Sequence, residues 1–90
     1  MGIKKFFDDM KKTSEELNKI LEEGYSETML EKFKETALRL KWKGEEGDAF
    51  RQKVLETIKA IGNGKKEMFL LKTIANIPKE MIDFSREQNV

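Results

Sequence analysis

The chain has 90 residues, of which 39% are charged and 38% hydrophobic, and its 18 basic and 17 acidic residues leave a formal net charge of +1. This length allows one domain, and the interleaved charges disfavour a nucleic-acid binder, which usually shows a basic excess. The absence of cysteine and histidine from the sequence removes disulfides, the usual zinc sites and the common nucleophile–base pairs of enzymes.

The first half of the chain carries an apolar stripe with the three- and four-residue spacing of an amphipathic helix. Because the phase of this stripe continues through Gly24, we predict one long helix over 3–41, kinked near that glycine. The alternative is two helices, since Gly24 can end one helix and Ser26 or Thr28 can begin the next. The stripe consists of Ile3, Phe6, Met10, Thr13, Leu17, Leu21, Tyr25, Met29, Phe33, Ala37 and Leu40.

The segment WKGEEGDAF, residues 42–50, is the clearest turn in the sequence. Two glycines bracket two glutamates, and Asp48 is expected to cap the helix that follows. Gly44 can adopt the positive φ that a chain reversal requires. We expect Trp42 to pack against this second helix near Phe50, which would lie in its first turn, and the indole would cover the end of the helical seam.

Two shorter stripes follow the turn and predict helices over 48–61 and 66–87. Ile61 and Leu70 are about half a turn out of phase at 100° per residue, so we place a break at 62–64. The members of the two stripes are Phe50, Val54, Ile58 and Ile61, and then Leu70, Ile74, Ile77, Met81 and Phe84.

These elements predict an all-α protein with a single helical domain over 1–90. We expect a helical hairpin with its central turn at 42–47 that pairs with a second copy in a dimeric four-helix bundle. The alternative is a monomeric four-helix bundle. A two-helix hairpin leaves part of each apolar face uncovered. A protein partner or a second copy is therefore expected on the stripe, at Phe6, Met10, Leu17, Leu21, Met29, Phe33, Val54 and Ile58.

The sequence offers no residues for catalysis, cofactor binding or metal binding, and we expect no enzyme. Adjacent carboxylates such as Asp8 and Asp9 point about 100° apart on a helix, so they do not converge on a metal. Lys41 and Lys43 flank Trp42, yet the acidic residues of the same loop oppose phosphate binding, and nucleic acid is disfavoured. Nowhere do eighteen apolar residues run together, so no membrane span is expected. The N-terminus lacks the apolar stretch of a cleavable signal peptide, which leaves a cytoplasmic protein or one secreted without such a peptide.

Trp42-Lys43-Gly44, followed by Phe50 eight residues after the tryptophan, resembles the central turn of the Trp-X-Gly (WXG) small-protein family of type VII secretion. The resemblance implies a helical hairpin that pairs with itself or a relative into a four-helix bundle and is exported by a membrane ATPase machine. The first hypothesis is therefore a non-enzymatic helical binding protein, a WXG-like partner or substrate of type VII secretion. The alternative is a small immunity, antitoxin or phage-encoded inhibitor protein that acts by protein–protein binding.

Overall fold

A computed structural model describes residues 2–61 and 68–88 of the chain. Within these ranges there are five α-helices and no strand, so the all-α fold predicted from the sequence is confirmed. The predicted break at 62–64 lies outside the described residues. The helices are α1 (Gly2–Leu21), α2 (Glu27–Leu38), α3 (Glu45–Ile61), α4 (Met68–Ala75) and α5 (Ile77–Gln88).

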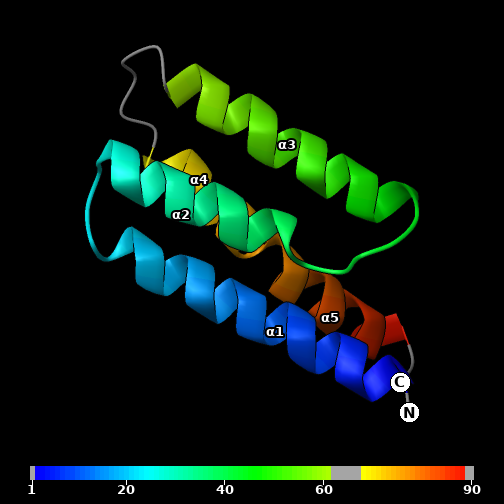
Figure 1. Cartoon of the computed structure of the whole chain (residues 1–90). Coiled ribbons are helices and arrows are strands. Elements are labelled where there is room, and N and C mark those ends of the chain that lie inside the picture. The colour runs from blue at the N-terminus through cyan, green and yellow to red at the C-terminus, as the bar shows by residue number, and fades with distance from the viewer. Residues whose placement is uncertain (1, 62–67, 89–90) are drawn as a thin grey trace.

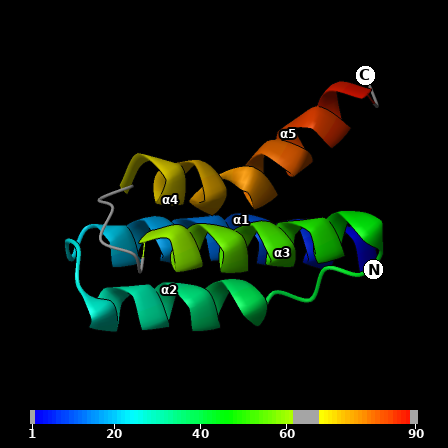
Figure 2. The ribbon, with the colours of Figure 1, turned by 90° about the horizontal axis from the view of Figure 1, so that it is seen from above.

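The helices run in alternating directions, and α4 and α5 follow one another in the fourth position of the bundle (Figure 1). α1 contacts α2, α2 contacts α3, α3 contacts α4, and both α4 and α5 contact α1. The second view shows α4 lying along the first three helices while α5 diverges from α3 (Figure 2). One chain thus closes a ring of helices around a shared interior, which is the arrangement of a four-helix bundle rather than of a two-helix hairpin.

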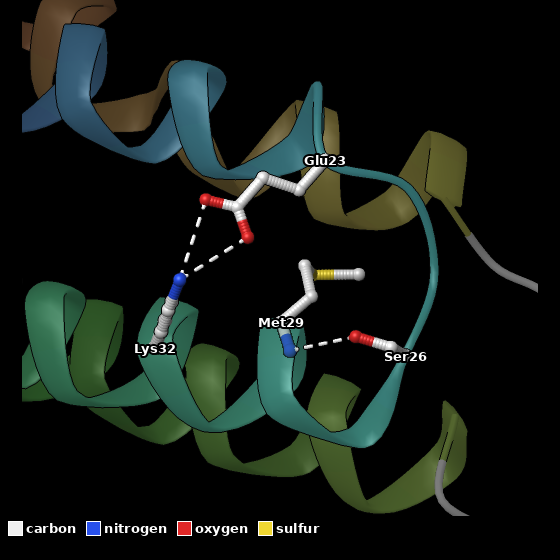
Figure 3. A network of polar contacts seen from close by, with 4 residues as sticks. All are labelled: Glu23, Ser26, Met29 and Lys32. Atoms are coloured by element: carbon white, nitrogen blue, oxygen red, sulfur yellow. Dashed lines mark hydrogen bonds and ion pairs between the residues drawn. The ribbon is translucent and has the colours of Figure 1, made fainter.

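The predicted continuous helix over 3–41 is wrong, because the chain leaves the helix after Leu21 and starts a new one at Glu27. Gly24 has a φ of +87°, a left-handed conformation that glycine adopts at little cost and that ends α1. Ser26 is the N-cap of α2, and its Oγ accepts a hydrogen bond from the backbone N–H of Met29 at 3.0 Å (Figure 3). The two-helix alternative is therefore the observed one.

The start of α3 also differs from the prediction. The helix begins at Glu45, and the carbonyl of Gly44 accepts the hydrogen bond from the N–H of Asp48 at 3.0 Å. Asp48 is therefore a residue of the first turn rather than the N-cap, and Phe50 lies in the second turn. Asp48 joins Glu45 and Glu46 near the positive end of the helix macrodipole, where carboxylates are stabilising.

The predicted helix over 66–87 is divided in the structure. Its described part consists of α4 and α5, which are separated by Asn76. The carbonyl of Asn76 accepts a hydrogen bond from the N–H of Glu80 at 2.9 Å, so a new helix starts at this point. Pro78 stands in the first turn of α5, where its missing N–H costs no intrahelical hydrogen bond.

The interior is built from apolar side chains of all five helices and of the turn before α3. Burying each large apolar side chain contributes about 1.5–3 kcal/mol, so this set provides the main driving force for folding. Its members are Met10, Leu17, Met29, Leu30, Phe33, Ala37, Leu40, Trp42, Phe50, Val54, Ile61, Leu71, Ile74, Ala75 and Ile82.

Candidate functional site

The Trp42 turn has the geometry expected from the sequence. Trp42 is only 5% exposed, and its ring lies against that of Phe50 with centroids 5.4 Å apart and planes inclined by 37°. Gly44 has a φ of +93°, in the region that favours glycine. The ring contact and the positive φ are therefore confirmed as features of the turn, although Phe50 reaches the indole from the second turn of α3.

Gly47 is a residue of this turn whose importance the sequence did not reveal. It is buried, and a Cβ atom built on it would overlap the carbonyl oxygen of Trp42 and come within 3.1 Å of the indole Cγ. The first turn of α3 therefore packs directly against the backbone of Trp42. The signal in the sequence was the second glycine of the segment, which we interpreted only as one of the two glycines that bracket the turn.

Arg51 does not contribute a free cation beside Trp42. Its Nη2 donates a hydrogen bond to the carbonyl of Leu40 at 3.0 Å, and its Nη1 lies 3.4 Å from Oδ1 of Asp48. The side chain thus joins α3 to the chain leaving α2. Lys41 and Lys43 are exposed on either side of the indole.

An apolar groove of about 290 Å³ opens beside the Trp42 turn, where α5 diverges from α3 (Figure 2). Its lining is mainly apolar and offers packing surface, and its two charged side chains, Glu46 and Lys53, are of opposite sign. The lining residues are Trp42, Glu46, Ala49, Phe50, Lys53, Ile77 and Met81.

The residues predicted to form a partner interface lie in or against the interior of the chain. Met10, Leu17, Met29, Phe33 and Val54 are fully buried in the core. Phe6, Leu21 and Ile58 are partly buried and pack against it. The prediction of an outer binding surface is therefore wrong for the five fully buried residues, because other helices of the same chain cover them.

Other apolar side chains are exposed instead, and no pattern in the sequence indicated their exposure. Phe69 is 78% exposed, and it borders a shallow hollow shared with Leu21 and Met68 at the junction of α1 and α4. Leu70, Leu55 and Tyr25 are exposed to a lesser degree, at 40–43%. The apolar surface available to another molecule is thus different from the predicted stripe.

A polar cluster that sequence reasoning missed connects α1 to the α4–α5 junction. Ser14 is 1% exposed, and its Oγ accepts a hydrogen bond from the backbone N–H of Lys79 at 3.1 Å. Asn18 donates from Nδ2 to Oδ1 of Asn76 at 2.9 Å and to the carbonyl of Ser14 at 2.9 Å. A side chain of α1 therefore satisfies an N–H in the first turn of α5, a group that has no partner within its own helix.

Acidic side chains do not gather into a metal site in the part of the chain that the structure describes, since no group of three or more potential ligands is close enough to hold an ion. Among the same residues, no helix is long and apolar enough to cross a membrane. No family model, curated protein or solved structure matched the chain. The resemblance to the WXG family therefore depends on the residues of the Trp42 turn.

Proposed function

We propose that this chain is a non-enzymatic protein that acts by binding another protein through its outer surface. The function then corresponds to that of small helical immunity proteins, antitoxins or phage-encoded inhibitors. The observation that carries this proposal is the exposure of Phe69 on α4. Aromatic side chains that rest in solvent beside other apolar groups are typical anchors of protein interfaces.

The composition of α4 supports this proposal. The helix reads MFLLKTIA, and a helix with apolar side chains on most of its faces is usually buried on most of them. Here Leu71, Ile74 and Ala75 are buried, whereas Phe69 and Leu70 point away from the core. A binding partner that covers Phe69, Met68 and Leu21 would remove this apolar surface from water.

Photo-crosslinking in the cells that encode the protein tests the proposal. A benzophenone-bearing phenylalanine replaces Phe69 in one variant and Leu55, an exposed side chain on α3, in a control variant. We expect position 69 to capture one specific protein that position 55 does not capture. With the purified target, Phe69→Ala should weaken binding at least tenfold and Leu55→Ala should not. Equal capture at both positions, or no specific capture at position 69, would contradict the proposal.

A WXG-like role in type VII secretion is the second candidate, and the Trp42 turn favours it. The indole–Phe50 contact and the positive φ of Gly44 support the resemblance. An export assay in the native host, with and without the membrane ATPase of the secretion machine, tests this role. Export that stops when the ATPase gene is deleted would support it, and export that continues unchanged, or no export in either strain, would contradict it.

A further inference from the structure

The fourth position of the bundle covers only part of α3. The 17 residues of α3 span about 25 Å, whereas the 8 residues of α4 span about 12 Å. α4 lies along the C-terminal half of α3, and α5 diverges from the N-terminal half (Figure 2). Instead of following α3, α5 packs against α1 and α4. About 13 Å of α3 therefore borders the apolar groove beside Trp42 and not a helix of the same chain.

The groove has an apolar floor that another side chain can cover. Trp42 and Phe50 are 5% and 3% exposed, so their rings form the floor and not the rim. Ile77 and Met81 of α5 line the opposite wall and are partly buried. Ala49 is exposed on α3, and its small side chain leaves the floor open. Covering this apolar surface with an apolar side chain of another molecule would be favourable.

Glu46 and Lys53 give the groove a direction. They are seven residues apart on α3, about 10 Å along the helix axis and close to the same face. Both side chains are exposed, and the ion pairs found among residues 2–61 and 68–88 involve neither of them. The macrodipole of α3 accounts for the acidic residue in its first turn, but it does not account for a cation two turns later beside an apolar floor.

We propose that the groove binds an amphipathic helix of another protein, which lies between α3 and α5 and runs antiparallel to α3. An acidic residue of that helix faces Lys53, and a basic residue seven positions later faces Glu46. Two apolar side chains, three and four positions after the acidic residue, enter the groove between these charges. Anchors with this spacing are the usual way in which an amphipathic helix binds a groove. The order of charges also suits the bound helix, because an acid near its N-terminus and a base near its C-terminus complement its macrodipole.

The size of the groove favours side chains over a small-molecule ligand. Its volume of about 290 Å³ lies just below the range of about 300–1,000 Å³ that is usual for pockets enclosing such ligands. A helix that places two side chains in the groove keeps its own backbone outside it. Phe69 lies in the first turn of α4, toward the other end of α3 (Figure 1). The inference therefore goes beyond the proposed function, since it concerns a second surface.

Fluorescence anisotropy with the full chain and a fluorescein-labelled peptide tests the inference. The matched peptide is about 12 residues long, which gives three helical turns, and a hydrocarbon staple on its solvent face keeps it helical. Its glutamate precedes two leucines by three and four positions and a lysine by seven. The reversed peptide exchanges the glutamate and the lysine. We expect the matched peptide to bind saturably and the reversed one to bind about fivefold more weakly, as two exposed charge pairs allow. A variant that carries both Glu46→Lys and Lys53→Glu should invert this preference.

Two exposed alanines of α3 provide the control for position. Ala49→Met fills the groove and should weaken binding of the matched peptide about tenfold through steric overlap. Ala60→Met is the matched control, because Ala60 is also exposed on α3 but does not line the groove. It should leave the affinity unchanged. Circular dichroism verifies that every variant folds, and sedimentation equilibrium measures whether the chain associates with itself.

The inference is overturned if the matched peptide does not bind, if both peptides bind equally, or if the two alanine variants have the same effect. Dimerisation of the chain that Ala49→Met abolishes would also overturn it, because a second copy would then occupy the groove. Phe69→Ala should not change the affinity for the peptide. Failure of this inference and failure of the proposed function, which crosslinking at position 69 tests, are therefore distinguishable.

Discussion

Gly47 has less space for a side chain than Gly24 or Gly44. Its position against the carbonyl oxygen of Trp42 leaves no room for a methyl group, and backbone atoms cannot move aside as a flexible side chain can. We expect Gly47→Ala to lower the free energy of unfolding by about 3 kcal/mol, the upper part of the usual range for overpacking a core. Urea denaturation followed by circular dichroism measures this loss.

Gly44 and Gly24 provide the controls for this prediction. A Cβ at either position would meet open space, but both residues have a positive φ. Replacement by alanine should therefore cost only the backbone strain, about 1 kcal/mol at each site. If Gly47→Ala cost no more than Gly44→Ala, the close contact between α3 and Trp42 would not exist in solution.

Trp42 should be the most important side chain of the turn. Truncating a buried aromatic residue removes its packing and leaves a cavity, so Trp42→Ala should cost about 3–5 kcal/mol, and Trp42→Phe should cost less. Urea melts of both variants give these values, with the exposed Lys43→Ala as a control expected within about 0.5 kcal/mol. Midpoints close to that of the unmodified protein for both tryptophan variants would mean that the indole is unimportant, and the family resemblance would then lose its support.

At the scale of the elements, the sequence predicted the helical content and the central turn but missed several helix boundaries. The boundary between α1 and α2 was missed for an identifiable reason. Leu21, Tyr25 and Met29 are four residues apart, as they would be on one helix face. Tyr25 is nevertheless exposed in the loop, and Ser26 caps the next helix. The periodicity across the loop is therefore a coincidence, and the local signals of Gly24 and Ser26 were the correct guide.

The contacts between elements were less predictable than the elements themselves. Ser14 is four residues after Met10 and three before Leu17, so it lies on the buried face, but the sequence does not show which N–H it meets. That partner is the backbone of Lys79, 65 residues away. For the same reason the burial of the predicted interface stripe could not be recognised, since the covering helices come from distant segments.

Ser14→Ala should detach the start of α5. The change leaves the buried N–H of Lys79 without its acceptor, at a cost of about 1–3 kcal/mol. Hydrogen exchange should show faster exchange of the Lys79 amide, while the amides of α2 and α3 change little. Thr73→Ala is the matched control, because the Oγ1 of Thr73 donates an exposed hydrogen bond to the carbonyl of Phe69 within α4. Unchanged exchange at Lys79 in Ser14→Ala would show that the hydrogen bond contributes nothing to the docking of α5.

At the scale of the whole molecule, the core is closed by helices of one chain. The fully buried stripe residues, among them Met10 and Phe33, are covered by other helices of the same chain. A bundle assembled from two hairpins would instead share its core between two chains. Its stability would then depend on protein concentration, as it does for any obligate dimer.

We therefore expect the urea midpoint of the chain to be independent of protein concentration. The melts are measured in ~0.5 M NaCl, where the Debye length falls to a few ångströms and contacts between surface charges contribute little. Under these conditions, melts at about 2 μM and about 200 μM should coincide, whereas an obligate dimer would gain about 2.7 kcal/mol over this hundredfold range. A midpoint that rises with concentration in high salt would contradict a core closed by one chain. It would favour the dimeric bundle implied by the WXG resemblance, because salt cannot screen the burial of apolar side chains shared between two copies.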